Sequence, residues 1–473
     1  MVTAAVHAIW REVRWAAREL AWRFSLSWRW WLILAIIVLA VAGIKGTNTP
    51  YILVSVWFGG LAVWLRMAPQ SHWRWISGPL WRRRVRRRVR SAWPALADVS
   101  GLTRRRKGRD GEPVLVYPAL RVRWRDGLLT LRPRLLVGQT VEDYRKASER
   151  IRETFGATRV QVTVDRPCVI TLSFNDTLAH VVPRPRPELT TLPEIDEVTM
   201  GLAENGELWR LRLSGTHTLV AGCSGSGKAS LVWGVTLGLA PAVHSGIVQL
   251  WGVDLKGGME LSMGRPLFTC YATEPEEAVA LLEDAVQRMR KRAARLAGVT
   301  RQHSPSAADP FVVVIIDEVA ALTAYLNDRD LKRRANDALA LLCSQGRALG
   351  YSVVACLQDP RKEVLGMRGL FTQTVSLRLR DREETAMVLG DGAVASGAAC
   401  HTIPATSPGV AFVVPPEGGT PVRVRAWRVD DETIRYTAAL FAAPVQIPVV
   451  VKQPAADNPA PRRRSRQTQE SAA

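Results

Sequence analysis

The segment from residue 218 to residue 231 most constrains what this chain of 473 residues can fold into. Four residues that favour a buried strand, 218–221, lead into the turn GCSGSG, and Lys228 then opens an apolar segment with helical character. In such a strand, loop and helix, successive backbone N–H groups converge on phosphate oxygens, and the helix N-terminus and the lysine add positive charge. We therefore predict a phosphate-binding loop within an α/β domain. The alternative is an ordinary glycine-rich turn.

One position departs from the pattern G-x-x-x-x-G-K-[ST]. Ala229 stands where a hydroxyl group would coordinate Mg²⁺, and Ser230 follows it. We expect ATP and Mg²⁺ as cofactors, with Ser230 as the candidate replacement for the missing hydroxyl. The predicted nucleotide-binding residues are Gly222, Cys223, Ser224, Gly225, Ser226, Gly227, Lys228, Ala229 and Ser230.

Two later segments favour nucleotide hydrolysis. Residues 311–316 form a continuous apolar run, as a strand buried on both faces requires, and the run ends in Asp317 and Glu318. Asp317 is predicted to hold the Mg²⁺ shell and Glu318 to polarise the attacking water, the alternative being a structural carboxylate pair. Residues 351–357 predict a further strand, and Gln358 at its end is suited to sensing the γ-phosphate. Strands alternating with helices, with chemistry at strand ends, predict an open parallel sheet.

Positive charge dominates the composition. The formal net charge is +21 and the pI is near 10.5, which favours a polyanionic partner or an anionic membrane surface. Arginine is concentrated in residues 82–90, 104–109 and 462–466. The six cysteines are widely spaced, show no metal-ligand spacing and predict buried thiols in a reducing compartment.

The N-terminal part predicts attachment to the cell membrane. Residues 1–27 have the pattern of a basic amphipathic helix, and the apolar runs 30–44 and 51–65 predict a transmembrane hairpin within residues 28–66. A signal peptide and a buried soluble hairpin are the alternatives. Arginines on both outer flanks place both termini, and therefore the motor domain, in the cytoplasm.

The remaining chain divides into four predicted parts. Residues 67–111 are expected to be a basic juxtamembrane linker, either solvated near anionic lipid or guiding DNA. A small α/β domain follows at 112–187, with strands at 114–117, 128–131, 160–164 and 168–174, a helix at 141–155, and a stiff Pro-Arg-Pro-Arg-Pro linker at its end. The motor spans 188–429, with a further strand at 247–253 and a long helix at 274–297. Residues 430–473 predict one short helix and a disordered basic tail.

The motor segments resemble a known family. The stretches GTHTLVAGCSGSGKAS, VDLKGGMELS, VVVIIDEVAALTAYLNDRDLKRR, SQGRALGYSVVACLQDPRKEV and LRDREETAMVLGDGA are similar to the FtsK/SpoIIIE double-stranded DNA pumps, above all to the membrane-anchored conjugation translocases of actinobacteria. The resemblance implies a RecA-like P-loop motor in a homo-hexameric ring around duplex DNA, with Lys228, Asp317, Glu318 and Gln358 as catalytic residues and Asp317 and Ser230 at the metal.

The arginine that the family supplies in trans aligns with Thr374. Arg378 on the same strand, or Arg347 in the segment SQGRALG, is the candidate to replace it.

The leading functional hypothesis is an ATP-driven duplex DNA translocase for conjugal transfer of a plasmid or integrative element. A chromosome-segregation pump at the division septum shares the same motor motifs. A protein-export ATPase of type VII secretion shares the fold, but a single ATPase domain argues against it. A membrane scaffold that binds nucleotide without turnover is suggested by Ala229. Only 46 residues follow Trp427, too few for a winged-helix DNA reader, so we expect binding through phosphate contacts.

Overall fold

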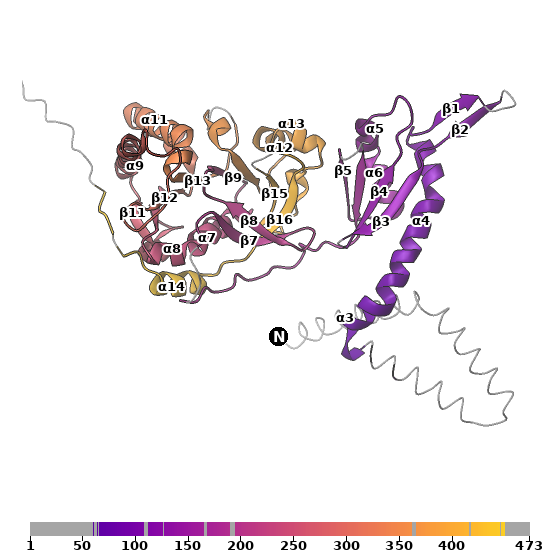
Figure 1. Ribbon diagram of the computed structural model, residues 1–473, viewed down its shortest axis with the longest axis horizontal. Coiled ribbons are helices and arrows are strands. Elements are labelled where there is room, and N and C mark those ends of the chain that lie inside the picture. Colours follow the sequence, from indigo (N-terminus) through magenta and orange to yellow (C-terminus); the bar gives the residue numbers. More distant parts are fainter. Residues whose placement is uncertain are drawn as a thin grey trace, which may run out of the picture. The chain divides into compact units, whose positions relative to one another are not determined.

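The computed structural model describes residues 60, 64, 66–107, 112–125, 127–164, 168–189, 194–361, 366–415, 418–444 and 446–449. The chain divides into two compact units, and the boundary between them lies at Asn175 and Asp176 (Figure 1). Residues 112–175 of the predicted small α/β domain fall in the first unit, whereas its last residues, 176–187, and the predicted motor fall in the second.

From Pro69 the described part of the first unit is helical where the sequence predicted a linker. Its opening elements are α3 (Pro69–His72), the π-helix η1 (Trp73–Ser77), α4 (Gly78–Val99) and the antiparallel pair β1 (Arg104–Lys107) and β2 (Pro113–Val116). One face of α4 carries Val89, Trp93 and Leu96, which are buried in the core of the unit. The prediction of a solvated linker is therefore wrong for α4, because its apolar side chains recur at helical spacing between the arginines.

A four-stranded antiparallel sheet completes the first unit. Its elements are β3 (Leu120–Arg125), β4 (Leu128–Pro133), α5 (Val141–Lys146), α6 (Ser148–Phe155), β5 (Arg159–Thr163) and β6 (Val169–Ser173). The strands lie in the order β3-β4-β6-β5. The predicted helix 141–155 is interrupted at Ala147, and the predicted strands 128–131, 160–164 and 168–174 match β4, β5 and β6 closely. The strand β3 was not predicted.

A mixed sheet of ten strands forms the centre of the described second unit. Its strands are β7 (Glu197–Ala203), β8 (Leu208–Arg212), β9 (Thr218–Ala221), β10 (Val248–Val253), β11 (Phe268–Ala272), β12 (Phe311–Ile316), β13 (Tyr351–Leu357), β14 (Gln373–Ser376), β15 (Val410–Val414) and β16 (Val422–Ala426). They lie in the order β11-β10-β12-β13-β9-β14-β15-β16-β7-β8. Pairing is parallel from β11 to β14 and antiparallel from there to β8. The predicted parallel sheet is thus the half of a larger mixed sheet that carries the predicted phosphate loop.

Helices cover both faces of this sheet. The helices are α7 (Lys228–Gly238), α8 (Ala240–His244), α9 (Pro275–Leu296), α10 (Val319–Thr323), α11 (Arg329–Gln345), α12 (Arg382–Leu389), α13 (Asp391–Ala395) and α14 (Asp431–Leu440), with short 3₁₀ turns η2 (Ser262–Leu267), η3 (Arg347–Leu349), η4 (Arg368–Leu370) and η5 (Cys400–Thr402). Helices α7, α8 and α14 lie on one face, and α9 and α11 lie on the other (Figure 1).

Strand β12 shows why its apolar run is continuous. Phe311, Val313 and Ile315 pack into the core on the α7 side, whereas Val312 and the alternate residues after it pack into the core beneath α9 and α11. Because successive side chains of a strand point to opposite faces, a strand covered on both sides favours an apolar residue at every position. The sequence prediction of a doubly buried strand is confirmed.

The Pro-Arg-Pro-Arg-Pro segment packs on the second unit. The Arg184 N–H donates to Arg428 O at 2.9 Å, Arg428 N–H donates to Val182 O at 2.9 Å, and the Arg184 guanidinium lies over the Trp427 ring at 5.6 Å. Burial lowers the pKa of Arg184 to about 10. The segment was expected to be a stiff linker, and these contacts show that it is packed on the folded surface of the second unit.

No helix in the described part of the chain is both long and apolar enough to cross a bilayer. The predicted amphipathic segment 1–27 lies outside the described residues, as does the predicted hairpin apart from residues 60, 64 and 66. The predicted helix after Val429 is confirmed as α14, and the predicted tail beyond residue 449 also lies outside the described residues.

Candidate nucleotide-binding and hydrolysis site

The predicted phosphate loop connects β9, at the centre of the sheet, to the N-terminus of α7. Its backbone is fixed from both sides, because Gly222 N–H donates to Leu357 O at 3.0 Å and Cys223 N–H donates to Arg378 O at 2.9 Å. Gly227 has a φ of +101°, and a Cβ there would lie 2.4 Å from the backbone nitrogen of Gly409. Only glycine fits such a position, so the sequence pattern reflects real packing constraints.

Lys228, the first residue of α7, folds back over the loop. Its Nζ donates hydrogen bonds to Gly222 O at 2.6 Å and to Cys223 O at 3.2 Å. Burial lowers the pKa of Lys228, and the nearby carboxylates of Glu318 and Asp317 counteract this effect. A lysine held at the mouth of the loop by carbonyl groups is placed to exchange them for phosphate oxygens.

Asp317 and Glu318 follow β12, two strands away from β9 in the sheet. Asp317 is fixed by its own N–H, which donates to Val253 O at 3.1 Å. Glu318 is buried, and burial raises the pKa of its carboxyl group despite the charges of Lys256 and Lys228. Within the described residues Glu318 Oε2 is a buried atom that has no hydrogen-bond partner. A carboxylate with a raised pKa and an unused acceptor is suited to receive a proton from water.

Gln358 lies between the phosphate loop and the carboxylate pair Asp317 and Glu318. It follows β13, which lies between β12 and β9, and its N–H donates to Glu318 Oε1 at 3.4 Å. The parallel strands therefore bring the phosphate loop, the carboxylate pair and Gln358 to the same edge of the sheet, as the sequence predicted.

Lys256 is a residue of this site that the sequence reasoning did not assign. It lies just after β10, and its Nζ is 2.7 Å from Asp317 Oδ2. Burial lowers the pKa of Lys256, but its hydrogen bond to Asp317 and the negative charges of Asp317 and Glu318 together outweigh burial, so the pKa is raised. The only signal in the sequence was its place after a buried strand, in the stretch VDLKGG.

The donor atoms at the site fit a magnesium nucleotide. Asp317 offers a buried carboxylate, and Ser230 is half-buried in the first turn of α7, whereas Ala229 is exposed. Carboxylate and hydroxyl oxygens are the ligands that Mg²⁺ prefers, usually together with phosphate oxygens and water. Asp317 and Ser230 are therefore the residues that would hold the ion.

The two candidate arginines lie at opposite ends of the central strands: Arg378 lies at their carboxyl ends and Arg347 at their amino ends. Arg378 follows β14, and its Nη2 donates to Ser224 O in the phosphate loop at 3.1 Å. Arg347 is exposed, and its Nε donates to Gly215 O at 2.9 Å, before β9 begins. Arg378 thus contacts the loop of its own chain, and Arg347 lies away from it. Thr374, the position at which the resemblance places the family arginine, is half-buried within β14.

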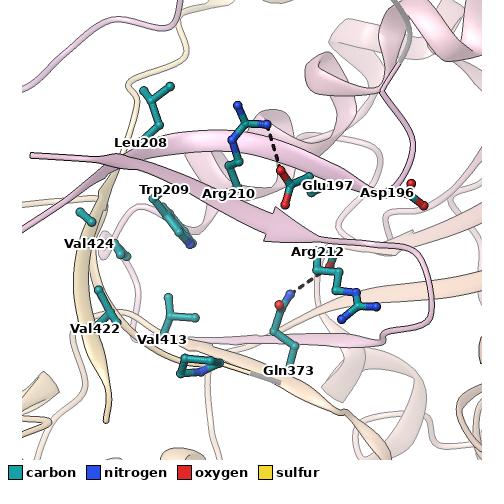
Figure 2. Close-up of a pocket in the computed structure, with 12 residues that line it drawn as sticks. Asp196, Glu197, Leu208, Trp209, Arg210, Arg212, Gln373, Val413, Val422 and Val424 are labelled. Atoms are coloured by element: carbon teal, nitrogen blue, oxygen red, sulfur yellow. Dashed lines mark hydrogen bonds and ion pairs between the residues drawn. The ribbon is translucent and has the colours of Figure 1, made fainter. Parts of the chain in front are cut away.

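A cavity of about 490 Å³ also lies away from the phosphate loop (Figure 2). It lies between β8 and strands β14, β15 and β16, and Gln373 Nε2 donates to Arg212 O at 3.1 Å (Figure 2). Trp209 from β8 and Val413 from β15 form part of its apolar wall. Since Gln373 pairs with Thr218 at the beginning of β9, the cavity opens at the sheet edge opposite the loop.

Two separate regions of the chain match families of known DNA-transfer and DNA-translocating proteins. Residues 198–304 match the FtsK/SpoIIIE family, and residues 61–176 match the actinomycete conjugal transfer protein N-terminal domain. The second match covers most of the first compact unit, including α4.

Individual relatives extend the similarity over most of the chain. The transfer protein TraSA of Streptomyces ambofaciens is 30% identical over 320 residues, which are 63% of this chain and 75% of that protein. A sporulation regulatory protein of Streptomyces azureus is 32% identical over 211 residues, covering 42% of this chain and 68% of its own length. The solved structure of the pCW3 conjugation coupling protein TcpA aligns with a TM-score of 0.49 and 18% identity, over 75% of this chain and 99% of that one. From the two sequence relatives and the two domain matches, the chain belongs to the FtsK/SpoIIIE family, in its branch of actinobacterial conjugal transfer proteins.

Proposed function

We propose that this P-loop ATPase is a translocase that moves double-stranded DNA during conjugal transfer. The observation that carries the proposal is the convergence of the phosphate loop, Asp317, Glu318 and Gln358 at one sheet edge. Family membership supports DNA as the substrate, because relatives include proteins named transfer protein and DNA translocase. The match to the conjugal transfer N-terminal domain favours conjugation over chromosome segregation and protein export.

In this proposal Lys228 neutralises the β- and γ-phosphates, Asp317 and Ser230 hold Mg²⁺, and Glu318 activates the attacking water. Magnesium would supply charge neutralisation at the phosphates. Gln358, whose N–H contacts Glu318, senses whether the γ-phosphate is present. The protein works as a homo-hexameric ring, as its family resemblance implies. In that ring Arg347 is the candidate for a charge offered to a neighbouring subunit, because it is exposed and lies away from its own loop.

The membrane hairpin of residues 28–66 anchors this ring in the proposal. Helix α4 then supplies a basic surface, since most of its arginines are exposed while Val89 and Trp93 face the core. Such a surface attracts phosphate groups, of anionic lipid or of DNA.

The test is ATP hydrolysis by the full-length protein with and without duplex DNA. Glu318→Gln should bind ATP with near-normal affinity but hydrolyse it on the order of 10²-fold or more slowly, because the carboxylate that accepts the proton of water is gone. Lys228→Ala should lose both binding and turnover. Glu276→Gln, an exposed residue at the start of α9, is the matched control and should hydrolyse ATP normally.

Two results would contradict the proposal. Normal hydrolysis by Glu318→Gln would remove Glu318 from the catalytic site. Turnover that no duplex DNA stimulates would argue against DNA as the substrate of the motor.

A further inference from the structure

Lys256 contacts the oxygen that a magnesium ion needs. Its Nζ lies 2.7 Å from Asp317 Oδ2, and the side chain of Asp317 is only 8% exposed. Magnesium binds carboxylate oxygens at about 2.0–2.1 Å, in the same space as this ammonium group. Two cations at one oxygen repel each other, so the ion pair seen here and a metal bound to Asp317 exclude each other.

The backbone of Lys256 is held in place by hydrogen bonds to the buried carboxylate of Asp254. Asp254, fully buried at the end of β10, accepts hydrogen bonds from Lys256 N–H at 3.1 Å, Glu260 N–H at 2.8 Å and Leu261 N–H at 2.9 Å. These contacts fix the backbone that carries Lys256, so its side chain reaches Asp317 from a rigid base. The lysine side chain itself is 44% exposed, and it therefore has room to move away from the carboxylate.

The charges around the site explain why the ion pair between Lys256 and Asp317 is favourable. Asp317 is buried beside the equally buried Glu318, and two carboxylates without a cation would repel. Lys228 is turned away toward Gly222 O and Cys223 O, so among the described residues Lys256 makes the ion pair with Asp317. Of the two residues proposed to hold magnesium, Asp317 and Ser230, only Asp317 carries a charge, so the metal depends strongly on this carboxylate.

We propose that Lys256 is a positioning residue that competes with magnesium for Asp317: it holds the carboxylate while the site contains no nucleotide and leaves it when magnesium nucleotide binds. The inference rests on the proposed ATPase function. It implies that Lys256 weakens metal binding and so favours release of the magnesium–ADP product.

The experiment measures binding of a fluorescent ADP analogue to the full-length protein as Mg²⁺ is titrated. Lys256→Gln should lower the Mg²⁺ concentration at half-saturation by at least about fivefold, the factor expected for removing a like charge about 4 Å away in a high dielectric. Lys256→Arg keeps the charge and should resemble the original protein. Lys291→Gln, on the exposed face of α9, is the matched lysine control and should change nothing.

The outcomes separate the alternatives. An unchanged Mg²⁺ requirement in a folded Lys256→Gln protein would show that the ion pair is only structural and would overturn the inference. Weaker ADP binding both in Mg²⁺ and in EDTA would make Lys256 a phosphate ligand and would also overturn it. If the unaltered protein bound no nucleotide at all, the proposed function itself would fail.

A second measurement covers the case in which Lys256→Gln does not fold. Acetylation of lysine amines in the unaltered protein, quantified by mass spectrometry, should increase at Lys256 when magnesium–ADP is added, because the amine leaves Asp317. Lys291 serves as the internal reference. No increase at Lys256 would contradict its displacement.

Discussion

His217 lies directly before β9, and its environment makes the motor sensitive to acid. Its side chain is fully buried, and its Nδ1 accepts a hydrogen bond from Val353 N–H at 3.1 Å. Burial, with a smaller effect of the Arg347 charge, lowers the pKa of His217 to about 4. The ring is therefore neutral in the folded protein at neutral pH, and protonating it requires a charge in the core.

The consequence for stability has a defined sign. In the unfolded chain histidine titrates near pH 6.5, so below that pH the unfolded state binds the proton more readily. The contribution of neutral His217 to the free energy of unfolding is fully present above about pH 6.5 and is lost progressively as the pH drops toward 4. We expect the motor to lose about 2 kcal/mol between pH 7.5 and pH 5 from this group alone.

Urea denaturation of the full-length protein and of His217→Asn at both pH values checks this prediction. Asparagine can accept the Val353 hydrogen bond but cannot be protonated, so the variant should lose less stability on acidification. Equal losses in the two proteins would mean that other groups cause the acid sensitivity.

At the level of single elements, α4 links the basic surface of the first unit to its core. Trp93 is 2% exposed, and its Nε1 donates to Pro118 O at 2.7 Å. Trp93→Ala should destabilise this unit by about 3–5 kcal/mol, because it leaves a large cavity and an unpaired carbonyl group. Trp75 is 69% exposed, so Trp75→Ala should change stability by only about 0.5 kcal/mol or less.

Hydrogen exchange followed by mass spectrometry distinguishes the two variants within the full-length protein. Peptides from β4 and β6 should lose protection in Trp93→Ala, whereas peptides from β12 and β13 should not change. If Trp93→Ala left β4 and β6 fully protected, α4 would not be part of the core that stabilises this sheet.

For the whole molecule, the distribution of charge predicts how DNA is bound. The net charge of +21 and the exposed arginines of α4 favour contacts with phosphates, which carry no sequence information. The affinity of the full-length protein for unrelated duplexes should therefore fall steeply with salt and differ little between sequences. Titrations of several duplexes at two salt concentrations test this. A preference on the order of 10³-fold for one sequence would require a reading element.

The proposed membrane topology gives a second prediction at this scale. Cysteines introduced at Thr47, between the two apolar runs, and at Val99, which is 74% exposed at the end of α4, should react with an impermeant reagent from opposite sides of the membrane. The protein without added cysteines measures the background from Cys223, which is partly exposed. Reaction of both sites from one side would refute the hairpin.

The sequence by itself determined the elements whose signal is local. The phosphate loop needs glycines at fixed positions such as Gly227, and β12 needs a continuous apolar run because both of its faces are covered. Each of these requirements concerns neighbouring residues in the chain, so it can be recognised without knowing the fold. The placement of Gln358 beside Glu318 followed from the general rule that parallel strands present their carboxyl ends at one edge.

Only the tertiary structure decided which distant residues meet. Lys256 and Asp317 are 61 positions apart and touch because β10 and β12 are paired, which no local pattern specifies. The arginine-rich segment 82–90 was predicted to be part of a linker, either solvated near anionic lipid or guiding DNA, yet one face of α4 is buried against elements that follow it in the chain. Burial and pairing depend on the order of strands in a sheet, and that order is set by the packing of the whole chain rather than by any one segment.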